Sequence, residues 1–161
     1  MIDSLRDKTS IDVDTGEVRT SSEPVVLRSI ALGSCVAVVV YDRTHKTGGL
    51  AHIMLPGRSM KTESENRTKY AEDAVDTVLE AVTKLGTDTD NLEICVVGGA
   101  NVLQEGDISD KVTKSVKDYL KEIGLRWDKE RVGGIERRSV FLDVESGQVF
   151  ITEGEGTANE L

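Results

Sequence analysis

Cysteine and histidine are scarce in this chain. Two of each occur among 161 residues, and they form no CxxC or HxxxH pair. A structural zinc site needs about four protein ligands and a catalytic one about three, so the sequence does not support a metal site. Disulfides are rare in cytoplasmic domains of this size, and we therefore expect Cys35 and Cys95 to be free thiols.

Basic residues and long apolar runs are also lacking. The chain has 20 Lys and Arg against 29 Asp and Glu, a formal net charge of −9 at pH 7. Binding to nucleic acid or to an anionic membrane surface requires a basic patch that neutralises phosphates, so we expect neither partner. No run of about 18 apolar residues is present, and residues 1–7 lack the basic-then-apolar order of a secretory signal. The sequence thus predicts a cytoplasmic protein without membrane insertion.

What the chain does contain is enough apolar content for a core. Hydrophobic residues make up 38% of it, which suits one compact domain at this length. Both ends are polar. We expect a mobile N-terminal segment over 1–10, a single folded domain over 11–152 and a polar C-terminal tail over 153–161.

Strands outnumber helices in the predicted secondary structure. Apolar and β-branched runs bounded by turn residues predict strands over 25–30, 36–41, 50–55, 92–97, 140–144 and 148–151. Apolar residues at three- and four-residue steps, each series followed by a glycine, predict helices over about 66–85 and 109–123. Because strands and helices do not alternate one for one, the pattern favours an α+β layered domain over a doubly wound parallel sheet.

The segment Gly33-Ser34-Cys35 has the features of a nucleophile site. A Gly-Ser turn places Cys35 at the head of a predicted strand, where its sulfur can face a cleft while nearby backbone N–H groups stay free to bind an oxyanion. The polar connection 42–49 predicts a hairpin that brings the strand of His52 alongside, and a thiol of ordinary pKa needs such a base at neutral pH. Simpler interpretations stay open: Cys35 as a small buried hydrophobe, and His52 as a hydrogen-bonded core residue.

Other polar residues near these two carry weaker signals. Ser29 lies on the strand that leads into the turn, where its hydroxyl could bind the second imidazole nitrogen and fix the tautomer. Cys95 lacks such neighbours and fits the core, and His45 fits a solvated loop. Two glycine pairs, 98–99 and 133–134, match no phosphate-binding motif. The first is better interpreted as a tight turn near the site. The arginines that follow the second pair are better interpreted as part of a solvated face.

Several runs resemble the CheD family of chemoreceptor glutamine deamidases of bacterial and archaeal chemotaxis. They are LGSCVAVVVYD, GGLAHIMLP, Gly98-Gly99-Ala100 and GGIERRSVFLDVESGQV, so the resemblance spans about residues 11–152. It implies a layered, cysteine-hydrolase-like domain with packed β-sheets and two long helices on the outside, related in catalytic geometry to the cytotoxic necrotizing factor toxins.

The resemblance also implies a function and its residues. The family's nucleophile falls on Cys35, its base on His52, and its third residue, usually threonine, on Ser29. The implied reaction converts glutamines of methyl-accepting chemoreceptors to glutamate, with release of ammonia through a Cys35 thioester and an oxyanion held at Gly33-Ser34. It needs no metal and no cofactor.

Other functions and partners stay open. The family also binds the CheC phosphatase. A non-catalytic adaptor that binds chemoreceptors and the CheC phosphatase is the main alternative, and a thiol hydrolase acting on small amides is a more distant one. This chain also departs from the family at 108–112, where members often have IGxRN, which concerns partner contacts and local loop shape rather than the thiol chemistry.

Overall fold

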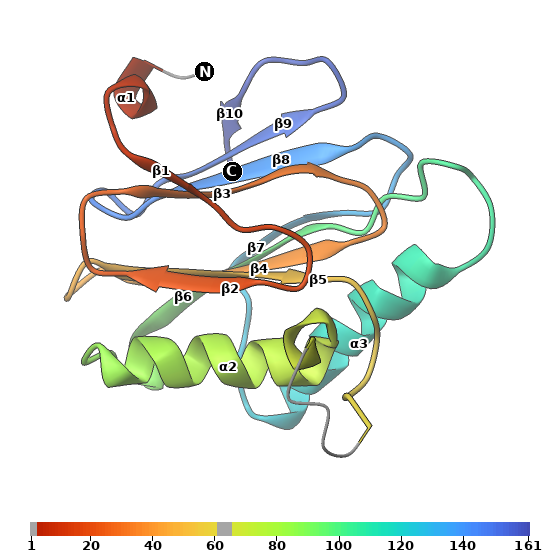
Figure 1. Ribbon diagram of the computed structural model, residues 1–161, viewed down its shortest axis with the longest axis horizontal. Helices are drawn as coiled ribbons and strands as arrows, with labels where there is room; N and C mark the ends of the chain where they lie inside the picture. The colour runs from red at the N-terminus through yellow and green to blue at the C-terminus, as the bar shows by residue number, and fades with distance from the viewer. Residues whose placement is uncertain (1–2, 61–65) are drawn as a thin grey trace.

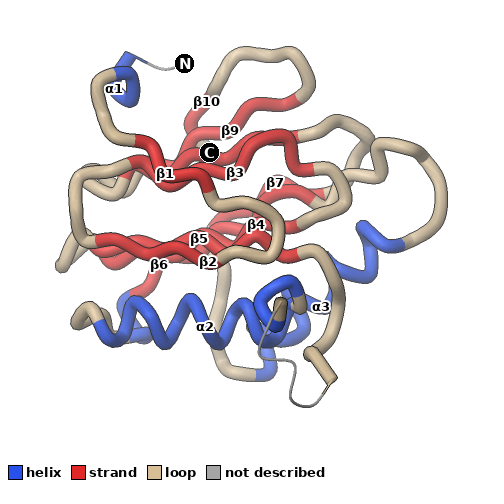
Figure 2. The backbone as a smooth tube through the Cα atoms, in the orientation of Figure 1, coloured by secondary structure: helices blue, strands red, loops and turns tan. Residues whose placement is uncertain are grey.

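The computed structural model describes residues 3–60 and 66–161, and within them it forms three layers (Figures 1 and 2). The outer sheet has the strand order β1-β3-β8-β9-β10. Its strands are β1 Ser10–Asp12, β3 Val26–Leu32, β8 Arg138–Asp143, β9 Val149–Glu153 and β10 Asn159–Glu160. The central sheet has the order β2-β5-β4-β6-β7. Its strands are β2 Val18–Ser21, β5 Thr47–Ile53, β4 Val36–Asp42, β6 Leu92–Gly98 and β7 Lys129–Val132.

The two long helices cover one face of this pair of sheets. The two long helices, α2 Ala71–Lys84 and α3 Ile108–Glu122, pack on the side of the central sheet that faces away from the outer sheet (Figure 1). A short helix, α1 Asp3–Arg6, lies near the outer sheet, and two 3-10 turns, η1 Arg67–Lys69 and η2 Thr89–Asn91, precede α2 and β6. The structure is therefore mixed, with two sheets and few helices, and this agrees with the α+β prediction.

Strand β4 lies at the centre of the molecule, and all of its residues are buried. Val36, Val38 and Val40 belong to the core between the central sheet and the helices, while Ala37 and Val39 belong to the core between the two sheets. Because side chains alternate along a strand, a strand covered on both faces needs an unbroken apolar run. The sequence of β4 therefore predicts a strand by itself.

Several elements differ from the sequence-based prediction. Helix α2 begins at Ala71 and not near 66, because Tyr70 forms an isolated bridge with Leu55 in extended geometry and the residues before it form η1. The short strands β1, β2, β7 and β10 were not predicted. Their sequences are largely polar and lack clear alternation, so only pairing with distant strands specifies them.

Both ends of the chain contact the outer sheet. Leu5 is 2% exposed and packs with Val26, Phe141 and Phe150. At the other end, β10 pairs with β9, and the Leu161 N–H donates to the Val149 carbonyl at 2.8 Å. The division into a mobile segment, a domain over 11–152 and a polar tail stays a prediction.

Candidate active site

Cys35 lies at the entrance to β4, directly after the bend at Gly33-Ser34. Its carbonyl accepts the Gly99 N–H at 2.8 Å, and the Gly33 carbonyl accepts the Ala100 N–H at 2.8 Å. A Cβ on Gly98 would lie 2.4 Å from the Cys35 carbonyl oxygen, and Gly98 has φ +116°, so only glycine fits there. The turn after β6 therefore packs against the bend at Gly33-Ser34 and holds its backbone in place.

His52 projects from β5 on the same side as Cys35. In the antiparallel pair of β4 and β5, His52 lies opposite Ala37, two residues beyond Cys35. Opposite residues share a face, and so do alternate residues on one strand, which makes Cys35 and His52 diagonal neighbours about 7–8 Å apart at their backbones. Their shared face is turned toward the outer sheet, where Ala37 and the half-buried Cys35 join the core between the sheets.

The hydrogen bonds of His52 define its tautomer. Its Nδ1 lies 2.9 Å from the Val13 carbonyl oxygen and its Nε2 lies 3.5 Å from Thr15 Oγ1. A carbonyl oxygen only accepts hydrogen bonds, so Nδ1 carries the proton and Nε2 of the neutral ring is an acceptor that faces the Thr15 hydroxyl. Burial lowers the pKa of His52, and the Val13 hydrogen bond offsets only part of this effect. The ring is thus held neutral, with Nε2 ready to accept a proton.

Ser29 contacts the same carbonyl rather than the imidazole. Its hydroxyl donates to the Val13 oxygen at 2.7 Å, and the side chain is 1% exposed. The expectation that this hydroxyl binds the second nitrogen of His52 is corrected here, because the Val13 carbonyl takes that place. Ser29 orients the ring only indirectly, by fixing the carbonyl that both side chains share.

Thr15 is the residue near this pair that the sequence did not indicate. It lies in the turn between β1 and β2. Burial raises the pKa of the Cys35 thiol, and the nearby Thr15 hydroxyl offsets part of that rise. The resting thiol is therefore neutral, and a base has to remove its proton during the reaction. Since β1 and β2 carry no periodic signal, nothing local in the sequence marks Thr15.

Donors for an oxyanion are present at the bend. Among the described residues, neither the Ser34 N–H nor the Cys35 N–H donates to a protein acceptor. Gly33 lies against Arg137: a Cβ at Gly33 would be 3.0 Å from the Arg137 guanidinium, so a larger residue would crowd that side chain. An unpaired N–H beside a nucleophile is the feature that stabilises a developing negative charge on substrate oxygen.

The remaining polar candidates are structural. Cys95 is 8% exposed in the core between the sheets, and burial raises the pKa of its thiol to about 11. His45 Nδ1 lies 2.6 Å from Asp42 Oδ2 in the turn between β4 and β5. Arg138, expected on a solvated face, is 6% exposed and donates to the carbonyls of Gly98 and Gly133. It thus braces the turn behind Cys35.

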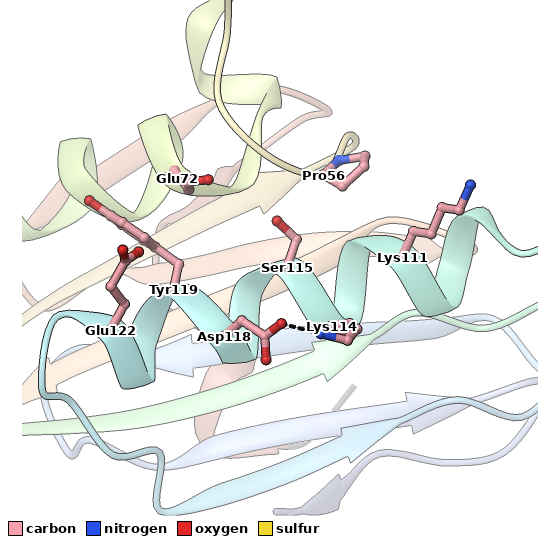
Figure 3. A pocket seen from close by; sticks show the side chains of 8 residues that line it. All are labelled: Pro56, Glu72, Lys111, Lys114, Ser115, Asp118, Tyr119 and Glu122. Carbon is pink, nitrogen blue, oxygen red and sulfur yellow. Dashed lines mark hydrogen bonds and ion pairs between the residues drawn. The ribbon is translucent and has the colours of Figure 1, made fainter.

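A separate groove lies on the helical side of the molecule. It has a volume of about 470 Å³ and is formed mainly by α3, with Pro56 and Glu72 opposite (Figure 3). Basic side chains line the part of the groove near the start of α3 and acidic ones the part near its end, with Lys114 and Asp118 paired between them, and Cys35 does not line it. Within the described ranges, no three side chains of His, Cys, Asp or Glu lie close enough together to hold a metal ion. In the same ranges, no helix combines the length and the apolar sequence that crossing a membrane requires.

A pH dependence of stability follows from the buried imidazole. Because burial lowers the pKa of His52 below its ordinary value of 6.5, the unfolded chain binds a proton at pH values where the native ring is still neutral. Native stability is therefore expected to fall as pH drops below about 6.5, and to carry no such loss above it. Urea unfolding between pH 7.5 and 5 should show a steeper loss for the wild type than for His52→Gln. Parallel curves would contradict this expectation.

The chain is similar in sequence to known proteins over most of its length. Residues 54–153 match the family model described as CheD chemotactic sensory transduction, a segment that begins after Cys35 and His52. The chain therefore belongs to the CheD family, and the resemblance seen in the sequence is confirmed.

Individual relatives cover nearly the whole chain. The "Probable chemoreceptor glutamine deamidase CheD" of Methanococcus vannielii is 39% identical over 153 residues, which is 92% of this chain and 98% of that protein. The "Chemoreceptor glutamine deamidase CheD" of Thermotoga maritima is 35% identical over 141 residues, or 86% and 88%. A relative from Clostridium botulinum with the same name as the first is 32% identical over 158 residues, or 94% and 98%.

Proposed function

We propose that the protein is a cytoplasmic protein-glutamine deamidase that converts glutamines of methyl-accepting chemoreceptors to glutamate. One observation carries the proposal: Cys35 at the entrance to β4 and His52 on β5 lie on the same face, with His52 held neutral and its Nε2 able to accept a proton. The names of the relatives support the substrate class. The layered domain, proposed to span 11–152, is of the cysteine-hydrolase type.

The first half of the proposed reaction forms a thioester. Cys35 Sγ attacks the side-chain amide carbon of a receptor glutamine while its thiol proton goes to His52 Nε2. The N–H groups of Ser34 and Cys35, at the turn begun by Gly33, hold the oxyanion. The C–N bond then breaks, and the imidazolium gives its proton to the departing ammonia.

The second half restores the enzyme. A water molecule loses a proton to His52 Nε2 and attacks the thioester carbon, and the same N–H groups hold the second oxyanion. The C–S bond breaks, the sulfur recovers the proton, and glutamate is left on the receptor. Ser29 acts as a positioning residue through the Val13 carbonyl, which keeps the same tautomer in both halves.

The proposal is tested with a purified cytoplasmic fragment of a chemoreceptor. Mass spectrometry should find Gln-to-Glu conversion at discrete positions, with one ammonia released for each. A fragment that binds the protein but gains no glutamate would favour the adaptor that binds receptors and a CheC-type phosphatase. Release of ammonia from free glutamine at the same rate as from the receptor would favour the small-amide hydrolase.

A further inference from the structure

Arg137 is exposed and lies beside the bend that carries Cys35. A Cβ on Gly33 would lie 3.0 Å from one guanidinium nitrogen of Arg137, and the same nitrogen donates to the Ala31 carbonyl at 3.4 Å. Gly33 precedes Cys35 by two residues, which span at most about 7 Å of chain. The guanidinium is therefore close enough to the nucleophile to contact a substrate bound there.

The Arg137 guanidinium has no carboxylate partner among the described residues. Every other arginine except Arg126 forms an ion pair with a described Asp or Glu. Glu136, the neighbouring acid in the sequence, lies against Gly154, where a Cβ would be 3.3 Å from its carboxyl group. Among the described acceptors Arg137 binds the Ala31 carbonyl alone, so most of its five N–H donors remain available to a ligand.

Three large apolar side chains are exposed on the segments that meet at this bend. Ile30 is 50% exposed on β3, just before the bend. Leu103 is 78% exposed in the connection between β6 and α3, and Ile135 is 54% exposed in the connection between β7 and β8. Exposed apolar side chains that gather at one place are typical of a surface that binds another protein.

Backbone hydrogen bonds hold these segments next to one another. The Ala100 N–H donates to the Gly33 carbonyl, and the Asn101 N–H donates to the Gly134 carbonyl, both at 2.8 Å. The connections β3–β4, β6–α3 and β7–β8 lie at the same end of the molecule (Figure 1). The charge of Arg137 and the three apolar side chains therefore belong to one surface around the nucleophile.

We propose that Arg137 binds a carboxylate of the protein substrate close to the target glutamine, while the exposed apolar side chains contact the same polypeptide. The planar N–H donors of a guanidinium match the two oxygens of a carboxylate, which makes this anion its best protein partner. The inference rests on the proposed function, because it concerns how that active site selects among glutamines. Glutamines with an acidic neighbour are expected to be converted in preference to others.

Three variants test the charge at this position. Arg137→Gln removes it, Arg137→Lys keeps it, and Arg126→Gln is the matched control, since Arg126 is exposed and precedes β7 near the start of β6, whereas Cys35 contacts the turn after β6. Arg137→Gln should raise KM for the receptor fragment about 5-fold with kcat near wild type, as the loss of one exposed ion pair would. Arg137→Lys should recover part of this loss, and Arg126→Gln should match wild type. An unchanged KM, a loss confined to kcat, or an Arg137→Lys enzyme no better than Arg137→Gln overturns the assignment.

The same loss should be obtained from the substrate side. Each Asp or Glu within about four residues of a converted glutamine is replaced by alanine, one at a time. One of these replacements should raise KM about 5-fold for wild type and have little further effect on Arg137→Gln, because the ion pair is already broken. Replacements that each cost both enzymes the same factor would show that Arg137 binds no carboxylate near the glutamine.

A binding measurement separates this inference from the proposed reaction. The dissociation constant for the receptor fragment is measured by calorimetry with Cys35→Ala and with Cys35→Ala/Arg137→Gln. The second protein should bind about 5-fold more weakly in about 0.05 M NaCl, and the difference should shrink in about 0.5 M NaCl, where salt screens exposed charges. Equal dissociation constants would overturn the role of Arg137 even if wild type converts glutamine. Weaker binding, together with no conversion by wild type, would refute the deamidase proposal and retain the role of Arg137 in recognition.

Discussion

Replacing Cys35 with alanine is expected to reduce conversion of receptor glutamine to the uncatalysed background, a loss of about four orders of magnitude or more. Without the sulfur no thioester forms, and the neutral imidazole of His52 can only act on water. Fold and receptor binding should stay intact, because alanine is smaller and Cys35 sits half-buried at a bend and not within a strand. Mass spectrometry of the receptor fragment, together with released ammonia, measures the effect.

Cys95→Ala is the matched control for this loss. The second thiol lies in the core between the sheets, and burial raises its pKa to about 11, so it is not expected to react at neutral pH. Its variant should retain most of the activity and lose only some stability. Activity of Cys35→Ala within tenfold of wild type would contradict the assignment, as would an equal loss in Cys95→Ala.

The second large effect is expected at His52. His52→Gln keeps a side chain of similar size that can still donate to the Val13 carbonyl, but it cannot accept a proton at neutral pH. Conversion should fall by about 10²–10⁴-fold, the range of general acid–base catalysis. Because the resting thiol is neutral, the remaining rate should climb with pH as the sulfur ionises by itself. Initial rates from pH 6 to 9.5 measure both features.

His45→Gln serves as the histidine control. His45 lies in the turn at the far end of the β4–β5 pair, beside Asp42, and contacts neither reacting group. It should leave the rate and its pH profile unchanged. If His52→Gln kept the wild-type pH profile at a uniformly reduced rate, His52 would be a structural residue and not the base.

The sequence predicts the positions of Cys35 and His52 because the strands next to them, β4 and β5, are largely apolar runs. An unbroken apolar run needs burial on both faces, and the polar connection 42–49 predicts a hairpin. Together they place Cys35 at the entrance to one strand and His52 on its neighbour. The glycine pair at 98–99 forms a tight turn beside Cys35, as its sequence predicts. There the backbone of Gly98 approaches Cys35 too closely for any side chain.

The supporting groups could not be predicted in the same way. The Val13 carbonyl and the Thr15 hydroxyl come from a turn between two short strands whose pairing is decided by tertiary contacts, β1 with β3 and β2 with β5. Ser29 illustrates the consequence, since its expected bond to the imidazole goes instead to a backbone oxygen that no sequence pattern reveals. Arg138 is another example, because its burial depends on the carbonyls of Gly98 and Gly133 and on the Glu153 carboxylate, which the fold brings together around it.

The buried, neutral state of the pair has a functional meaning under this account. A resting thiolate would react with oxidants and electrophiles, whereas a neutral thiol becomes a nucleophile only as its proton leaves toward His52. Burial raises the pKa of Cys35 and lowers the pKa of His52, so both groups are neutral before the proton is transferred. Reactivity then depends on substrate reaching the bend at Gly33-Ser34.

The most direct test of the central claim, that Cys35 and His52 act as one unit, is the rate of glutamine conversion by the double variant Cys35→Ala/His52→Gln compared with both single variants. Residues that serve one chemical step are strongly non-additive. The account predicts that the double variant is no slower than Cys35→Ala alone. A double variant slower than Cys35→Ala by the full factor that His52→Gln costs the wild type would show two independent contributions, and would contradict it.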